Sequence, residues 1–363
     1  MICESLLASI NKGRLGLNQG IPIGLEKLES VIDGLTQSTY TLLFAGTGSG
    51  KSSLALYAYV YKPVMEHLED DKLEIIYFSL EMSANFIFAK LLSMYIFDTY
   101  GVQLSTKELY SKKKGYTLPE KYYDLVLESM KWLHKVEKVV RIYDKGLTAD
   151  KFYVLMLKKL EQLGSVEKTD TRKIYTPHNS DKTVEIVVDH LGLVRPTSGR
   201  KLKEEMDLLS AYCVTLRDTY GVSPLIIMQP NRDSTSMDRR KQGMINFRLS
   251  DTKDTGNPPQ DCNVALSILN PNRERLNTYN KYDISILGDT FRSITVLKNR
   301  EGISDVEIGC NFFGRIGIWK ELDKPENIND WEKYTNPMYI KNKDNQITKK
   351  DENVELNNLS IKV

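Results

Sequence analysis

Short runs of apolar residues alternate along the chain with longer stretches in which apolar positions recur every three or four residues. The runs are typical of strands buried on both faces, and the stretches have the spacing of amphipathic helices. The runs lie at 39–45, 73–80, 138–144, 184–189 and 223–229. The helical stretches lie at 51–68, 83–100, 119–133, 148–164 and 201–220. This alternation predicts an α/β fold with a mostly parallel central sheet and helices on both faces.

The second half of the chain adds four apolar runs with short connections, which predict an antiparallel extension of the sheet. These runs lie at 263–269, 293–299, 306–312 and 316–322. The polar, aperiodic stretch 164–183 is expected to be a surface loop. Residues from 323 onward are rich in Asn and Lys and are expected to form an extended or partly disordered arm. Residues 3–10 carry a short apolar stripe, which predicts a small helix that needs a surface to dock on.

Composition narrows the class of protein. The 363 residues are 41% hydrophobic and 27% charged, as expected of a globular protein in water. The net charge of +2 provides no overall basic field, so contacts with nucleic acid must come from local patches. The four cysteines lie far apart, which argues against a zinc site or a disulfide framework. No run reaches the length of a membrane span, about 18 apolar residues, and no signal-peptide pattern is found, so a cytoplasmic location is expected.

The segment AGTGSGKS (45–52) joins a predicted strand to a predicted helix and fits the Walker A pattern, with Ala45 where the first glycine usually stands. Backbone N–H groups of such a loop surround phosphates, and the helix that follows contributes its positive end. Lys51 is expected to reach the outer phosphates and Ser52 to ligate Mg²⁺. A simple glycine-rich turn is the alternative, which the strand-then-helix context disfavours. The residues expected to bind ATP are Gly46, Thr47, Gly48, Ser49, Gly50, Lys51, Ser52 and Ser53.

Three polar residues at or just after the ends of other predicted strands are candidates for the chemistry of hydrolysis. Asp189 ends an apolar strand in the Walker B manner and is expected to organise Mg²⁺ together with Ser52. Glu81, which read alone is an acid near a helix N-terminus, is a candidate base for the attacking water. Gln229 ends another strand, where it could sense the γ-phosphate or simply be a polar residue at a strand end.

Several segments, taken in order, resemble the C-terminal motor domain of DnaB-type replicative helicases, which are RecA-like ring ATPases of helicase superfamily 4. The resemblance covers about residues 20 to 318. It is carried by the phosphate loop and by the segments YFSLEMSANFIFAKLLS, IVVDHLGLV, IIMQPNRD, FRLSDTKDTGNPPQDCNVALSIL and ITVLKNREG. It implies a RecA-like P-loop NTPase fold, with ATP and Mg²⁺ as ligands.

The resemblance also implies roles for individual residues. Glu81 would be the catalytic base, and Lys298 and Arg300 would be delivered to the nucleotide of the neighbouring subunit. Such an arginine finger is worth about 10³–10⁵ in rate because it neutralises charge on the γ-phosphoryl group. Without the resemblance, Lys298 and Arg300 would be interpreted as two charges on one face of a strand.

The sequence departs from the family's pattern at several points, which include Lys253 and Asp254 where an arginine and a glutamate are common and the polar insertion near 164–183. The sequence HLGLV stands where the family has tyrosine, leucine and glutamine after the Walker B aspartate. The family's N-terminal domain, which binds primase, has no counterpart in this sequence. The resemblance therefore implies hydrolysis more directly than it implies a primase or loader as partner. A stand-alone motor domain rich in Asn, Lys and Tyr would suit a phage or another mobile element.

Two basic clusters follow the Walker B strand and the Gln229 strand, where a ring motor contacts single-stranded DNA. Such residues would neutralise backbone phosphates without reading sequence. Each one alone is better explained as a solvated surface charge, and it is the two clusters at these loops that favour contact with DNA. The first cluster is Arg195, Arg200, Lys201 and Lys203, and the second is Arg232, Arg239, Arg240 and Lys241.

Together these features predict an ATP-dependent DNA helicase motor that assembles as a homo-oligomeric ring, expected to be a hexamer, around single-stranded DNA. Two alternatives remain: a recombinase or related ATPase that coats DNA without unwinding it, and a non-hydrolysing factor for helicase assembly. The predicted organisation is a docking helix and linker at 1–20, the RecA-like ATPase domain at 21–322 and a polar tail at 323–363.

Overall fold

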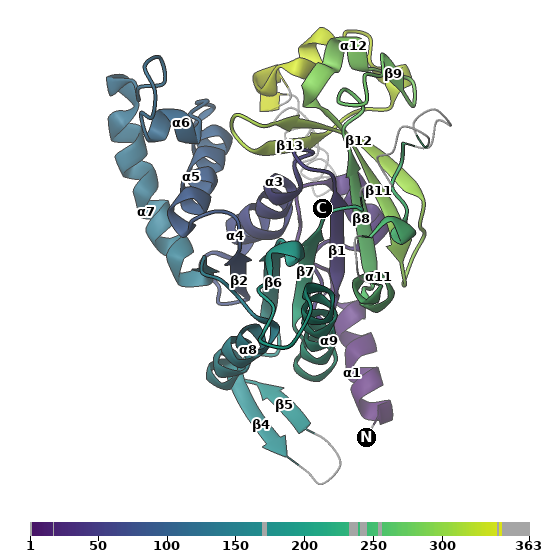
Figure 1. The fold of residues 1–363 in the computed structure, drawn as a ribbon. Coiled ribbons are helices and arrows are strands. Elements are labelled where there is room, and N and C mark those ends of the chain that lie inside the picture. The colour runs from purple at the N-terminus through teal and green to yellow at the C-terminus, as the bar shows by residue number, and fades with distance from the viewer. Residues whose placement is uncertain are drawn as a thin grey trace, which may run out of the picture.

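The computed structural model describes residues 2–16, 18–168, 173–231, 239, 245–252, 256–339 and 341–342. Its centre is a nine-stranded sheet in the order β13-β12-β11-β8-β1-β7-β6-β2-β3 (Figure 1). The strands of this sheet are β1 (Thr41–Ala45), β2 (Leu73–Ser79), β3 (Val140–Tyr143), β6 (Thr183–Asp189), β7 (Ser223–Met228), β8 (Val264–Leu269), β11 (Phe291–Asn299), β12 (Val306–Phe313) and β13 (Ile318–Glu321). The predicted α/β fold with a mostly parallel sheet is confirmed.

The sheet has a parallel part and an antiparallel part that meet at β8. Strand β1 pairs in parallel with both β7 and β8, whereas β11 pairs with β8 in the antiparallel sense and continues into β12 and β13. Strands β1, β2 and β6 therefore all have their carboxyl ends along one edge of the sheet, the edge where these strands stop. Strand β11 runs the other way and has its carboxyl end along the opposite edge. The predicted antiparallel extension is confirmed.

Helices cover the sheet, with α5 and α7 packed together along one flank and α8 and α9 packed together below (Figure 1). The Thr148 hydroxyl accepts a hydrogen bond from the N–H of Lys151 at the start of α8, and Gly221 ends α9 in the left-handed conformation. The main helices are α2 (Glu26–Ile32), α3 (Lys51–Leu56), the π-helix η1 (Tyr57–Tyr61), α4 (Lys62–His67), α5 (Ala84–Tyr100), α7 (Tyr123–Val139), α8 (Ala149–Leu163) and α9 (Leu202–Tyr220). Shorter helices are α6 (Thr106–Leu109), η2 (Glu120–Tyr122), η3 (Leu191–Leu193), η5 (Leu249–Asp251), α11 (Asn257–Asp261), α12 (Ile284–Leu287) and η6 (Gly288–Thr290). A two-stranded ribbon, β9 (Thr278–Tyr279) with β10 (Tyr282–Asp283), precedes α12.

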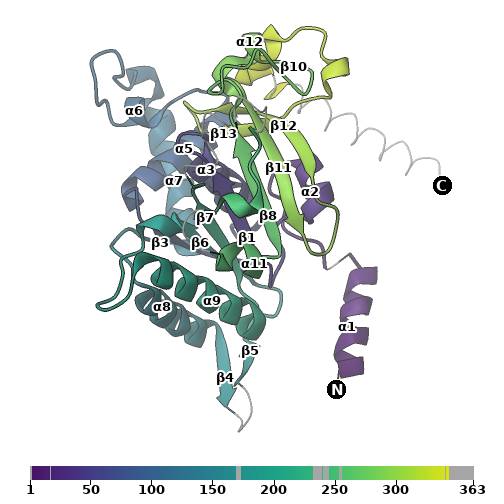
Figure 2. The same cartoon turned by 45° about the vertical axis from the view of Figure 1, so that its right-hand side comes forward.

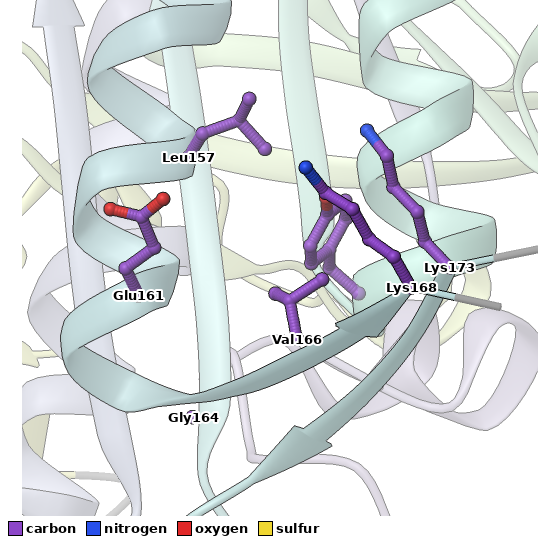
Figure 3. Close-up of a pocket in the computed structure, with 7 residues that line it drawn as sticks. Leu157, Glu161, Gly164, Val166, Lys168 and Lys173 are labelled. Carbon is purple, nitrogen blue, oxygen red and sulfur yellow. The ribbon is translucent and has the colours of Figure 1, made fainter.

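The stretch 164–183 is not the surface loop that its polarity suggests. It forms an antiparallel hairpin of β4 (Gly164–Lys168) and β5 (Lys173–Pro177), and the Tyr175 ring lies 5.2 Å from that of Tyr220 on α9. Most side chains of the hairpin are exposed, so the sequence lacks the apolar alternation by which a half-buried strand is recognised. A pocket of about 430 Å³ lies between this hairpin, α8 and α9. Figure 3 shows the side chains that line it.

The segment after β13 is also more ordered than the expected extended arm. It contains η7 (Pro325–Asn327) and η8 (Glu332–Thr335), and Ile328 and Tyr334 are buried against the domain. Further along, the ammonium of Lys341 donates hydrogen bonds to the carbonyls of Phe97 and Asp98 at the end of α5. A few apolar residues in a polar segment thus suffice to anchor it, and the expectation of an extended arm is wrong for its described part.

The N-terminal helix α1 (Ile2–Arg14) is longer than the predicted helix at 3–10 and stands apart from the sheet (Figure 2). The side chains of Leu6, Leu7 and Ile10 are all more than half exposed. An ion pair of 3.0 Å joins Lys12 to Asp181 beyond the hairpin. None of the helices in the described ranges has both the length and the apolar character needed to cross a membrane.

Candidate active site

The glycine loop connects the end of β1 to the start of α3. Gly48 and Gly50 have φ values of 72° and 103°, a region that L-residues rarely occupy. At Gly50 an added Cβ would lie 2.7 Å from Cζ2 of Trp319, so both the backbone and the space require glycine. Lys51 is buried at the first position of α3. The sequence therefore folds here into a loop whose N–H groups are followed at once by a helix N-terminus, the arrangement that binds phosphate.

Asp189 lies at the end of β6 and is completely buried. Its Oδ1 accepts a hydrogen bond of 3.0 Å from the hydroxyl of Ser52, and its Oδ2 accepts one of 2.8 Å from the hydroxyl of Tyr77. Burial raises the pKa of Asp189, while these two hydrogen bonds and the charge of Lys51 act against the shift. Carboxylate and hydroxyl oxygens are the ligands that Mg²⁺ prefers, so Ser52 and Asp189 fit the predicted metal site.

Glu81 lies two residues beyond the end of the adjacent strand, β2. Ser79, the last residue of β2, is level with Asp189 in the parallel pairing, and the Leu80 N–H donates to the Asp189 carbonyl at 2.7 Å. Burial is the main reason why the pKa of Asp189 is raised, but the negative charge of Glu81 acts in the same direction. Glu81 is itself exposed. The register of two strands thus brings this candidate base to the same edge as the candidate metal ligand.

Gln229 follows β7, the next strand of the sheet. Its Nε2 lies 3.3 Å from Nε2 of His190, the residue after Asp189. The structure therefore groups the phosphate loop, Asp189, Glu81 and Gln229 at the carboxyl ends of neighbouring parallel strands, as Figure 1 allows the reader to follow. Their catalytic roles stay predictions.

Lys298 and Arg300 lie at the opposite edge of the sheet. The Lys298 ammonium donates to the carbonyls of Pro259 and Gln260 at 2.9 and 3.0 Å, and an Arg300 Nη2 donates to the Gln260 carbonyl at 2.9 Å. The N–H of Arg300 bonds to the carbonyl of Asn263, just before β8 begins. The phosphate loop comes after β1, which runs parallel to β8 and is five residues long. The backbone of Arg300, beside the start of β8, is therefore at least about 16 Å from the phosphate loop, at the end of β1. Within one chain these cations do not reach the phosphate loop.

The basic residues proposed for DNA differ in their surroundings. Arg200 already pairs with Asp150 at 2.7 Å, and Arg239 pairs with Asp251 at 2.6 Å. All four residues of the first cluster are exposed, and the Arg195 guanidinium packs against Gly146. The remaining residues of the second cluster, Arg232, Arg240 and Lys241, lie outside the described residues.

Two arginines that contact the phosphate loop were missed by the sequence interpretation. An Nη1 of Arg273 donates to the Thr47 carbonyl at 2.6 Å, and Nε of Arg292 donates to the Ser49 carbonyl at 2.9 Å. Arg273 follows β8 in a polar turn that carries no recognisable signal. Arg292 could have been noticed, because it is a charged residue among the buried positions at the start of its strand.

Lys90 is a third cation that the sequence did not point to. It lies on α5 with its ammonium 5.6 Å from the centre of the Phe86 ring. Burial lowers the pKa of Lys90, and the negative charge of Asp189 opposes the shift. Helix α5 therefore places a cation within electrostatic reach of the candidate metal ligand.

Comparison with known proteins relates this geometry to a family. Residues 20–317 match the DnaB-like helicase C terminal domain. The replicative DNA helicase DnaB of Helicobacter pylori is 26% identical over 257 residues, which make up 70% of this chain but only 44% of that relative. A solved ATPase domain superposes with a TM-score of 0.66 at 15% identity, over 89% of this chain and 99% of the other. A DnaB-like replicative helicase, solved in a study of its interactions with primase, superposes with a TM-score of 0.65 at 15% identity, over 88% of this chain and 66% of the other. These structural likenesses show a shared RecA-like fold.

Proposed function

Because the chain belongs to the DnaB-like helicase C terminal domain family, we propose that it is the ATP-hydrolysing motor of a ring-forming DNA helicase. In this proposal the ring, expected to have six subunits, encircles single-stranded DNA, translocates along it and unwinds duplex. Primase or a loader is a candidate partner.

The observation that carries the proposal is the division of the site between two edges of one chain. Lys51, Asp189 and Glu81 stand at the carboxyl ends of parallel strands, and Lys298 and Arg300 stand at the opposite edge. A complete site then needs a second copy, placed so that one edge faces the other. Head-to-tail contacts of this kind repeat around a closed ring when the rotation closes.

The residues would share the work as follows. The phosphate loop and Lys51 hold the β- and γ-phosphates, and Ser52 and Asp189 hold Mg²⁺, which neutralises charge on the phosphate oxygens. Glu81 accepts a proton from the attacking water. Arg300 of the neighbouring subunit stabilises charge on the γ-phosphoryl group, and Lys298 assists it. Since the site lies between subunits, hydrolysis changes their contact and moves the DNA-binding loops of one past the other.

A complementation experiment tests the shared site. Glu81→Gln and Arg300→Ala each impair a different edge, so each variant alone should lose at least about 100-fold in DNA-stimulated ATPase activity. Mixed in equal amounts, they should regain activity, because about a quarter of the interfaces then combine an intact Glu81 with an intact Arg300. Unwinding of a forked duplex is measured on the same samples.

Glu301→Gln is the matched control, since it removes an exposed carboxylate next to Arg300. It should behave as wild type in both assays. A wild-type protein without ATPase activity would favour the non-hydrolysing assembly factor, and ATPase activity without unwinding would favour the DNA-coating ATPase. Arg300→Ala with full activity in isolation would refute the shared site.

A further inference from the structure

Strand β11 makes notable contacts at both of its ends. Near its start Arg292 reaches the phosphate loop of its own chain, and at its end lie Lys298 and Arg300. We infer that Arg292 is a positioning residue, which couples the state of a subunit's own phosphate loop to the cations that the subunit presents to its neighbour. The inference deepens the proposed function and rests on it.

The contact of Arg292 with the phosphate loop is buried and is fixed by several hydrogen bonds. The side chain is 1% exposed, and its Nε donates to the Ser49 carbonyl at 2.9 Å. Its Nη1 donates to the carbonyls of Asp289 and Phe291 at 2.6 and 2.7 Å. Its guanidinium carbon lies 5.4 Å from the centre of the Phe312 ring. These contacts leave the guanidinium a single orientation, so that Ser49 cannot move without disturbing it.

A cation is a costly occupant of this position. Phe291, Ile294 and Val296 of the same strand are fully buried, and an aliphatic residue in place of Arg292 would pack without the cost of burying charge. The nearest carboxylate, that of Asp289, lies 3.5 Å from Nη2 and is 67% exposed. Burial lowers the pKa of Arg292 to about 10, with Asp289 opposing the shift and Arg273 adding to it. The side chain stays charged at neutral pH, and an aliphatic side chain could not replace its bond to the loop.

Strand β11 is suited to carry a displacement from one edge of the sheet to the other. It is hydrogen-bonded to β8 on one side and to β12 on the other, so it moves as part of a stiff unit. Lys298 is six residues beyond Arg292, about 20 Å along the strand. The register with β8 shifts between Val296 and Lys298, and such an irregularity twists a strand and redirects its side chains.

A second contact links the same part of the sheet to the next residue of the loop. Trp319 of β13 stacks on Phe312 of β12, with ring centres 4.6 Å apart, and its edge faces Gly50. Ser49 and Gly50 are therefore both held by the antiparallel strands, through Arg292 and through Trp319. The loop that would bind nucleotide and the strands that carry Lys298 and Arg300 form one packed unit.

The experiment separates nucleotide binding from communication between subunits. For wild type, Arg292→Met and Arg292→Lys, the assembled protein is assayed for affinity for a fluorescent ATP analogue, for kcat and for the Hill coefficient of ATP hydrolysis. Arg292→Met should bind nucleotide within about 3-fold of wild type, whereas kcat should fall at least about 10-fold and the Hill coefficient should fall to about 1. Arg292→Lys keeps the charge but lacks the planar guanidinium with its several N–H donors. It should therefore restore neither kcat nor the Hill coefficient.

Lys281→Met, which removes an exposed cation from the ribbon next to the sheet, is the control and should match wild type. Unchanged kcat and Hill coefficient in Arg292→Met would overturn the inference. So would a fall in nucleotide affinity equal to the fall in kcat, because Arg292 would then only support its own loop. If Arg292→Met does not fold, Arg292→Lys decides by the same criteria. Wild-type protein without ATPase activity would instead remove the proposed function, which the complementation experiment detects independently.

Discussion

Oδ1 of Asp189 accepts a hydrogen bond of 3.0 Å from the hydroxyl of Ser52, although 137 residues separate the two in the chain. This pair joins the phosphate loop to the neighbouring part of the sheet through a carboxylate that has no access to solvent. The pKa of that carboxylate is raised, mainly by burial. The site therefore carries a charge that favours metal binding and disfavours the folded state without metal.

Asp189→Asn should separate these two effects. When the pKa of a carboxyl group is raised on folding, the folded protein loses stability as the pH rises from the unfolded-state pKa to the folded-state pKa. At neutral pH the charge of such a group is therefore destabilising. The neutral amide should therefore raise the melting temperature of the metal-free protein by about 2 °C. It should weaken Mg²⁺-dependent ATP binding at least about 10-fold. Calorimetry with and without Mg²⁺ measures both; a lower melting temperature in metal-free buffer would contradict the argument.

Gly50→Ala should disable the phosphate loop, because the added methyl meets both a φ of 103° and the ring of Trp319. Gly115 is the matched control, since its φ is 89° and an added Cβ meets nothing within 4 Å. Gly115→Ala should cost only the backbone strain, about 1 kcal/mol, with ATP binding unchanged. Gly50→Ala should cost about 2 kcal/mol or more and abolish ATP binding. Equal effects of the two substitutions would show that the Trp319 contact has no consequence.

Asp98→Asn should reveal that a contact between α4 and α5 stabilises the fold in a pH-dependent manner. Asp98 accepts hydrogen bonds from Lys62 at 2.8 Å and from Tyr61 at 3.0 Å. Burial acts to raise the pKa of Asp98, but Lys62, Lys320 and Tyr61 together outweigh it and the pKa is lowered overall. A lowered pKa gives stability that is present above the unfolded pKa and is lost as the pH falls through the folded one. The variant should lose about 1–2 kcal/mol at pH 7, and urea unfolding should show the difference narrowing toward pH 3.

The basic cluster after β6 should divide into DNA contacts and structural ion pairs. Replacing the exposed Lys201 and Lys203 together by alanine should weaken binding to oligo-dT and reduce its salt slope by about 1.4, with no change in stability. Arg200→Ala should instead destabilise the fold, because Arg200 bridges Asp150 and Glu205. Fluorescence anisotropy between 50 and 200 mM salt, with a thermal melt of each variant, distinguishes the two. An unchanged slope for the double variant would exclude these lysines.

Helix α1 should contribute to assembly and not to the fold of one subunit, because its apolar side chains contact so little of the domain. Replacing Leu6, Leu7 and Ile10 by serine should leave the melting temperature of dilute protein unchanged and shift the oligomer toward monomer. Light scattering as a function of concentration measures the shift. Lys12→Ala, which removes only the exposed ion pair with Asp181, is the control. Unaltered assembly of the triple variant would dismiss α1 as a docking element.

What the sequence determined by itself is local in origin. The strands and helices depend on side-chain periodicity, and the glycine loop depends on backbone angles that few residues tolerate. Residues that are close in the sequence therefore suffice to predict these elements. Asp189, Glu81 and Gln229 were found because each lies at or just after the end of an apolar strand. Lys298 and Arg300 were singled out only by resemblance to a family, because as a pattern they are two charges on a strand.

Only the tertiary structure placed residues relative to one another across the sheet. Arg292 and Arg273 reach the phosphate loop from more than 220 residues away, and no local pattern encodes such a contact. The hairpin at 164–177 and the anchored segment after β13 depend on single packed side chains, such as the partly buried Tyr175 and the buried Tyr334, which polar surroundings conceal. The separation of Lys298 and Arg300 from Lys51 follows from the antiparallel direction of β11, which hydrogen bonding between strands decides and composition does not.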